Sequence, residues 1–303
     1  MALRRFTDWF STPKSSPLID RRNFVNVQID AVGVGLAAAA SPFIPVFLAR
    51  LGASSWQIGL LSSMPALTGL LLAIPIGRYL QRQAKIIPWF SISRLGVIAC
   101  YALTGLAGLL IRDEQVLIPT VLFIWALATL PQTILAITFS VVMNAVAGPT
   151  GRFELMTRRW SLLGLTTSIP VFIIGQLLDN IPPPYNYPTV FISLSIGGLI
   201  SYYFSSHLRL KDREIPPIST KEPLVSKVKG YWGEISAEKP FTSFLFKRFI
   251  YTTGISLALP LFPLFFVNVV KATDSTIALI NTAQVGVMII GYFFWSHQSR
   301  ARS

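Results

Sequence analysis

Residues that carry catalytic or metal-binding chemistry are scarce in this sequence. Among 303 residues there is one cysteine, Cys100, and there are two histidines, His207 and His297. A single thiol excludes an intrachain disulfide, and neither histidine has a cysteine or carboxylate neighbour at metal-ligand spacing. The sequence also shows no paired carboxylates, no Ser/His/Asp set and no phosphate-binding loop. We therefore expect no enzymatic activity, no cofactor and no metal site.

Charged residues are also few. They make up 13% of the chain, whereas hydrophobic residues make up 52% and the mean hydropathy is +0.57. This composition is typical of a membrane-embedded protein, with the lipid bilayer as its first partner. The net charge of +13 comes from lysines and arginines that fall in the gaps between apolar runs. Because such spacing indicates topology rather than a polyanion-binding face, we expect no nucleic-acid partner.

Eight apolar segments are long enough to cross a hydrocarbon core of ~30 Å as helices. They cover 23–49, 56–77, 86–111, 116–147, 155–179, 188–205, 242–269 and 275–296. Prolines lie inside these segments, and we expect nine of them to kink helices rather than end them: Pro42, Pro45, Pro65, Pro75, Pro119, Pro131, Pro170, Pro260 and Pro263. Small residues such as Gly33 and Gly35 predict close helix contacts. The sequence therefore predicts an all-α, polytopic membrane protein.

The positive charges also predict its orientation. The N-terminal segment 1–22, the linker 206–240 and the other loops on that side carry twenty lysines and arginines, against three on the opposite side: Arg50, Arg112 and Lys271. Cytoplasmic loops are enriched in Lys and Arg. We therefore expect a multi-pass protein of the cell membrane with its N-terminus in the cytoplasm.

The two sides of the linker repeat one another. Pro42 and Pro45 in the first span correspond to Pro260 and Pro263 in the seventh, 218 residues later. The stretch 53–61 resembles 272–280 at a spacing of 219, so a slip of one residue separates the two matches. A tandem duplication of a six-helix unit explains both, and chance similarity between apolar sequences is the alternative.

A short basic hairpin between the second and third spans, 77–85, links this plan to a known family. With Gly77, Arg82 and Lys85 it resembles the loop signature of the major facilitator superfamily, although Gln81 and Ala84 replace its acid and second glycine. The resemblance implies two six-helix bundles that bind a small solute near the membrane midplane and expose it alternately to each side. Residues 23–205 would form one complete bundle and 241–303 the first two helices of another.

Because the family has twelve spans, the resemblance further implies that transport by this chain needs a homodimer or a complementing chain. A different class of function is the alternative. The chain could be a non-transporting membrane remnant or an interaction protein that keeps the fold.

Two charges lie at similar depth inside apolar spans. Asp30 is roughly 12 Å and Arg94 roughly 13 Å from the inner boundary at 1.5 Å per residue. Since an ionised group there costs about 2.5–3.5 kcal/mol, each needs a partner or water. We predict an Asp30–Arg94 pair or a shared wet cavity, and a structural clamp inside the bundle is the alternative.

The repeat places Arg248 opposite Asp30. Arg248 could then bind an anionic or zwitterionic solute, while Asp30 could carry a coupling proton; otherwise Arg248 only extends the positive edge of the membrane. Among uncharged residues, Gln132, Asn281 and Gln284 are substrate-site candidates. Hydrogen bonds between helices are the more common role of such side chains.

Overall fold

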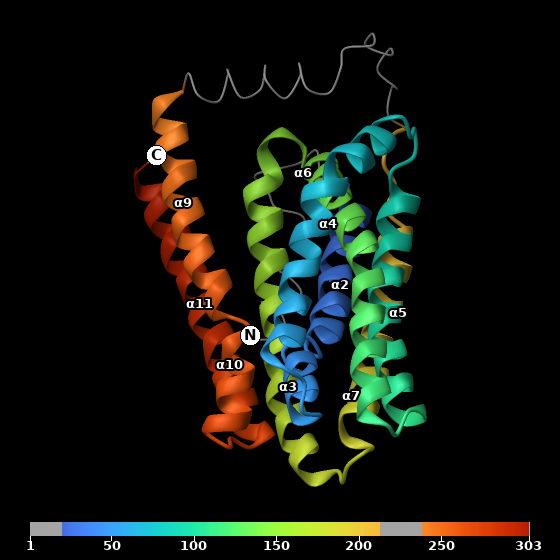
Figure 1. The fold of residues 1–303 in the computed structure, drawn as a ribbon. Helices are drawn as coiled ribbons and strands as arrows, with labels where there is room; N and C mark the ends of the chain where they lie inside the picture. Colours follow the sequence, from blue (N-terminus) through green and yellow to red (C-terminus); the bar gives the residue numbers. More distant parts are fainter. Residues whose placement is uncertain (1–19, 213–237, 303) are drawn as a thin grey trace, which may run out of the picture.

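The computed structural model describes residues 20–212 and 238–302, and every regular element in these stretches is a helix (Figure 1). The predicted all-α class is therefore confirmed. The elements in order are α2 (Arg21–Ala38), α3 (Phe43–Arg50), α4 (Ser55–Gln81), α5 (Ile87–Leu110), α6 (Glu114–Asn180), α7 (Asn186–Ser206), α9 (Lys239–Ala258), α10 (Leu261–Leu264), the π-helix η1 (Phe265–Val269) and α11 (Asp274–Arg302). The N-terminal segment 1–22 and the linker 206–240 lie largely outside the described residues.

Within residues 20–212 and 238–302, seven helical stretches are long and apolar enough to cross a membrane, which is compatible with a polytopic membrane protein. They are Arg21–Arg50, Ser55–Gln81, Ile87–Leu110, Glu114–Gly148, Gly151–Asn180, Asn186–Ser206 and Lys239–Val269. Each matches one of the first seven predicted spans to within about one helical turn. The eighth, 275–296, is helical in α11, but many side chains after Met288 are not described, so its crossing stays a prediction.

The fourth and fifth spans form one long element, α6, that turns at a glycine. Gly148 has φ 65° and ψ −172°, which lies outside helical geometry, and a Cβ added there would meet nothing within 4 Å. Glycine adopts positive φ at little steric cost. The chain therefore reverses between Glu114–Gly148 and Gly151–Asn180, where the sequence predicted a loop.

The first bundle is held by close contacts among α2, α5, α6 and α7. A Cβ added to Gly33 would lie 2.6 Å from both the carbonyl oxygen of Gly197 and the backbone nitrogen of Ser201 on α7. At Gly35 it would lie 2.9 Å from the carbonyl oxygen of Leu163 in α6. Only a residue without a side chain allows these backbones to approach so closely. The predicted close contacts at Gly33 and Gly35 are confirmed.

The prolines behave in two ways, which corrects part of the prediction. Pro65 and Pro75 lie inside the continuous helix α4, as expected. Pro42 and Pro260, in contrast, each stand directly before a new short helix, α3 and α10, so the first and seventh spans are broken rather than kinked. A proline at a helix start leaves no intrahelical hydrogen bond unmade, because the first four N–H groups have no partner there.

The helices α9 and α11 form a hairpin beside the first bundle. Figure 1 shows it leaning on the bundle near α10 and diverging from it towards the start of α9. On the α11 side, a Cβ added to Gly175 of α6 would meet the Cβ of Ala278, and the Thr282 hydroxyl donates to the Ser168 carbonyl at 3.4 Å. No residue of α9 is buried.

The core consists of two hydrophobic clusters, one towards each end of the first bundle. The larger one includes Phe43 and Phe47 of α3, Phe191 of α7, and Ile277 and Ala278 of α11, so it continues from the first bundle into the second group of helices. The smaller one draws on residues from Phe24 to Leu208 and stays within the first bundle. The two groups of helices therefore share a core at one end only.

Candidate functional site

The predicted repeat recurs as backbone geometry where the first and seventh spans break. Pro42 precedes α3 and Pro260 precedes α10, and Pro45 and Pro263 occupy the third position of those helices. These are the positions that the spacing of 218 pairs. At a helix start the backbone N–H groups have no intrahelical acceptor, so a proline, which lacks an N–H, costs no hydrogen bond there. The same motif therefore starts a helix in both copies.

A π-turn accounts for the one-residue slip in the repeat. The segment α3 has 8 residues. Its counterpart consists of α10, with 4 residues, followed by η1, with 5. The first segment ends with Leu51 N–H donating to the Phe47 carbonyl at 3.0 Å, and the second ends with Val270 N–H donating to the Phe265 carbonyl at 3.0 Å. The first bond spans four residues and the second spans five. A π-turn absorbs an extra residue without losing the helical bond.

The turns that follow match residue by residue at the spacing of 219. Gly52 has φ 81° and its counterpart Lys271 has φ 56°. Ser54 and its counterpart Thr273 then cap α4 and α11, each hydroxyl accepting a backbone N–H three residues on at 3.3 Å. Side-chain caps of this kind satisfy donors that the first helical turn leaves free. The repeat is therefore present in the fold as well as in the residue types.

A cavity of about 420 Å³ lies between the two copies. Its walls include Pro42 and Pro45 from the first copy and Pro263 from the second, so the equivalent bends face each other across it. Asn281 and Gln284 on α11 also line it. The structure thus brings together these two candidates, which the sequence singled out, at the junction between the two groups of helices.

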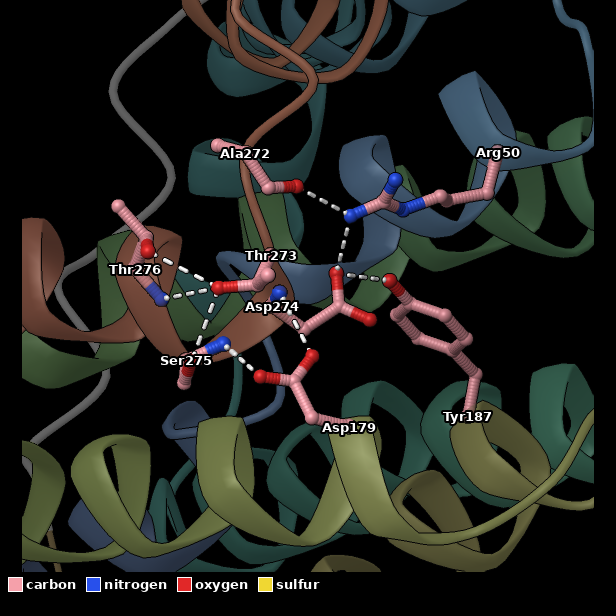
Figure 2. A network of polar contacts seen from close by, with 8 residues as sticks. All are labelled: Arg50, Asp179, Tyr187, Ala272, Thr273, Asp274, Ser275 and Thr276. Atoms are coloured by element: carbon pink, nitrogen blue, oxygen red, sulfur yellow. Dashed lines mark hydrogen bonds and ion pairs between the residues drawn. The ribbon is translucent and has the colours of Figure 1, made fainter.

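A network of polar contacts joins the two groups at the end of α3 (Figure 2). The Arg50 guanidinium on α3 donates to the Ala272 carbonyl at 2.7 Å and to the Asp274 carboxylate at 3.0 Å. The Tyr187 hydroxyl on α7 donates to the same carboxylate oxygen at 2.7 Å. Asp274 is buried and the Arg50 side chain is 34% exposed, so water screens this ion pair only in part.

Asp179 extends this network by capping a helix in the other group. Its carboxylate oxygens accept the backbone N–H groups of Asp274 and Ser275 at 2.9 and 3.1 Å (Figure 2). The first N–H groups of a helix lack intrahelical partners and attract anions. The last turn of α6 therefore holds the first turn of α11. We call Arg50, Asp179, Tyr187, Ala272, Asp274 and Ser275 the end network.

A second polar centre is buried inside the first bundle. The Arg94 guanidinium on α5 lies 3.0 Å from the Asp30 carboxylate on α2, so the predicted pair is confirmed. Arg159 on α6 approaches the same oxygen at 3.4 Å, and the Ser201 hydroxyl donates to the other oxygen at 2.6 Å. All four side chains are buried. Every element they come from belongs to the first bundle, which favours the alternative of a structural clamp.

Aromatic rings lie against the two guanidinium groups of this clamp. Two guanidinium groups face one carboxylate. The Arg94 guanidinium lies 4.6 Å from the centre of the Phe90 ring, and that of Arg159 lies 4.7 Å from Phe139 and 5.6 Å from Trp160. Ring faces attract cations, most strongly where water is absent. The clamp is thus built from electrostatic contacts on several sides.

The structure separates the remaining candidates. Arg248 is exposed on α9 and is not brought together with Asp30, which is enclosed by α5, α6 and α7. Gln132 is partly buried in α6 and is not among the residues that line the cavity between the copies. The two charged partners of Asp30, Arg94 and Arg159, come from its own bundle, so Arg248 is not needed to balance its charge.

The basic hairpin is shorter than predicted. Gly77 lies within α4, which continues to Gln81 because Leu80 is buried in the smaller hydrophobic cluster. Arg82 caps the helix end, and Lys85 is exposed before α5. Comparisons with protein-family models and with curated protein sequences give no match. The functional argument therefore depends on the residues and their geometry.

The sequence reasoning missed the end network and Arg159. In the sequence Arg50 is only one of the three cations on its side, and Arg159 is only one of the twenty on the other side, although it is 2% exposed in the structure. One signal for Asp274 was available, because the repeat places it opposite Ser55, the first residue of α4. A residue at a helix start beside a proline-containing repeat is a candidate for contacts between the copies.

Proposed function

We propose that this chain contributes to a secondary transporter that moves a small solute across the cell membrane by alternating access. The observation that carries the proposal is the repeated break: the first and seventh spans break at equivalent prolines, and residues of both breaks line one cavity. The plan resembles that of the major facilitator superfamily, whose halves rock about a central binding site. The end network supports it, because it joins the two groups at one end, while α9 at the other end has no buried residue.

The charge distribution supports an assignment of the two ends. Arg50, Arg112 and Lys271 belong to the end network or its surroundings, on the side with few cations, which the positive-inside rule places outside the cell. In that orientation the N-terminus is cytoplasmic, the end network joins the two groups of helices at the outer end beside a cavity of about 820 Å³, and the groups diverge towards the cytoplasm. This corresponds to an inward-facing state.

The exposed apolar side chains of α9 favour a second candidate function. Phe246, Phe249 and Tyr251 are all well exposed, and an apolar helix surface of this kind needs lipid or another protein against it. A membrane protein that keeps the fold as an interaction partner, without transport, would have the same surface. A transporter opens at one end of the junction between the two groups of helices while it closes at the other. An interaction protein does not need this motion.

Spin-label distances test for that motion. On a Cys100→Ser background, one pair of labelled cysteines replaces Lys85, which is exposed before α5 in the first bundle, and Lys239, which is exposed at the start of α9. A second pair replaces Arg112 and Lys271, both exposed near the end network. Distance distributions of the purified protein in lipid nanodiscs are then compared between the parent and a variant that carries Asp274→Asn.

Alternating access predicts opposite changes. Because Asp274→Asn removes the Arg50 ion pair, the distance near the end network should lengthen and the distance at the opposite end should shorten. Asp113→Asn is the matched control, since Asp113 caps α6 at the same end without contacting the second group. If the distance near the end network changes alone, or neither distance changes, transport is rejected and the interaction protein is favoured.

A further inference from the structure

We propose that the cavity between the proline bends binds an uncharged solute that has a flat apolar body and one hydrogen-bonding group. This inference rests on the proposed transport function and names its class of substrate. It departs from the expectation of an anionic or zwitterionic solute, which depended on Arg248. The argument uses the side chains that line the cavity and those that do not.

The size and the walls of the cavity suit a small, flat molecule. Its volume of about 420 Å³ lies within the range of roughly 300–1,000 Å³ that is typical of small-molecule sites. Phe262 and Phe266 on its wall are stacked, with ring centres 6.0 Å apart and planes inclined by 20°. Pro42 and Pro45 provide the facing wall. Aromatic and proline rings present broad apolar surfaces against which a planar body packs.

Two amide side chains supply the polar contacts. Asn281 is half-buried, and its amide nitrogen donates to the Ile277 carbonyl at 2.8 Å, which leaves its side-chain oxygen as an acceptor. Gln284, three residues later on the same face of α11, makes no hydrogen bond with the described residues. It offers both a donor and an acceptor. A solute with an amide or hydroxyl group would satisfy these atoms.

No charged side chain is among the described residues that line the cavity. The buried charges of the first bundle are enclosed in the Asp30 clamp; in the end network Arg50 pairs with Asp274, and Asp179 caps α11. A charged solute would therefore lose its hydration without meeting a counter-ion. Burial of an unpaired ion costs several kcal/mol, whereas a neutral amide loses much less. The lining discriminates against charge of either sign.

Three probes of similar size test this discrimination. Benzamide is neutral, benzoate is an anion and benzylammonium is a cation, and each has one ring. Their binding to the purified protein in nanodiscs is measured by equilibrium dialysis, with empty nanodiscs subtracted for partitioning into lipid. We expect saturable binding of benzamide and on the order of a hundredfold weaker binding of both ions.

Variants place the binding in the cavity. Gln284→Leu should weaken benzamide binding about fivefold, because it removes one hydrogen bond. Ile280→Trp should abolish it by filling the space from the cavity wall. Gln132→Leu is the matched control, since it removes the same side chain from α6 outside this lining, and it should leave binding unchanged. Each variant must keep the elution volume and helical content of the parent.

The inference is overturned if benzamide does not bind saturably, if an ion binds as well as benzamide, or if Ile280→Trp and Gln284→Leu leave binding intact. Its failure is distinct from failure of the transport proposal. Opposite distance changes at the two ends without benzamide binding would support transport and reject this substrate class. Benzamide binding without those changes would support the site and reject transport.

Discussion

Two aspartates with similar partners have different positions in this molecule. Asp30 accepts contacts from Arg94, Arg159 and a serine hydroxyl inside the first bundle, whereas Asp274 accepts contacts from Arg50 and a tyrosine hydroxyl on the other side of the junction. The side chains around Asp30 are almost completely buried, but the side chain of Arg50 is 34% exposed. The first arrangement clamps one unit together, and the second joins two units where water can enter and separate them.

The hydrophobic core shows the same difference. The cluster near Asp274 includes residues of both groups of helices, and the cluster at the opposite end is confined to the first bundle. Burial of apolar surface therefore reinforces the end network but does not hold the far end closed. A structure built in this way favours motion about the junction over deformation of the first bundle.

The largest effect is expected from Asp30→Asn. The change leaves the guanidinium groups of Arg94 and Arg159 buried without a counter-ion, and their Nε atoms already have no hydrogen-bond partner. Breaking a buried ion pair by removing one partner costs about 3–5 kcal/mol. We expect a large loss of thermal stability of the purified protein, measured by the temperature at which it aggregates.

Glu154→Gln is the control for this prediction. Glu154 pairs with Arg158 one turn later on α6, where both side chains are partly exposed. A pair of that kind contributes about 0.3–0.5 kcal/mol, so the control should differ little from the parent. Equal losses for Asp30→Asn and Glu154→Gln would show that the clamp does not stabilise the bundle.

An intermediate effect is expected where a helix cap crosses the junction. Asp179→Ala removes the carboxylate that caps α11, at about 1 kcal/mol, and so should shift the junction towards its open state. The readout is the labelling rate of an Ala272→Cys reporter on the Cys100→Ser background, because Ala272 is buried in the end network. We expect the rate to rise about fivefold.

The comparison needs a cap that does not cross the junction. Asp113 accepts the Gln115 N–H at 2.9 Å at the start of α6, within the first bundle. Asp113→Ala should therefore weaken its own helix by a similar amount and leave the labelling rate of the reporter unchanged. A rise of the same size in both variants would mean that the loss of any cap at this end loosens the structure.

The features that the sequence predicted well are those with a local physical signal. Apolar runs marked seven spans, because a helix across a bilayer needs about twenty apolar residues. The contact between Asp30 and Arg94 followed from two charges at equal depth, since each needs a partner there. The repeat was visible because proline and glycine have few alternatives at helix starts and turns.

The features that it missed depend on how helices pack. Arg159 lies near the start of a span, where a cation usually extends to the membrane surface, and only the packing of α6 against α2 turns it towards Asp30. Arg50, Asp179 and Asp274 have the composition of an ordinary loop. Their contacts exist because α11 packs closely on α6 at Gly175 and Ala278. No pattern along the chain specifies that pairing.

The smallest effect is expected in the turns of the repeat, and it compares the two copies directly. Gly52→Ala places a side chain at φ 81°, a left-handed conformation that costs about 1 kcal/mol for other residues, although nothing lies within 4 Å of the new Cβ. Gly59→Ala on the helix α4 is the control, because a new methyl there also meets nothing within 4 Å, and it should stabilise by about 0.5–1 kcal/mol.

Lys271→Gly should relieve the strain at φ 56° in the second copy, and the greater freedom of glycine in the unfolded chain makes that gain smaller than the loss at Gly52. Thermal unfolding of the three variants would show opposite signs for Gly52→Ala and Lys271→Gly if the two turns are equivalent, whereas a loss in both would show that the lysine has a role of its own in the second turn.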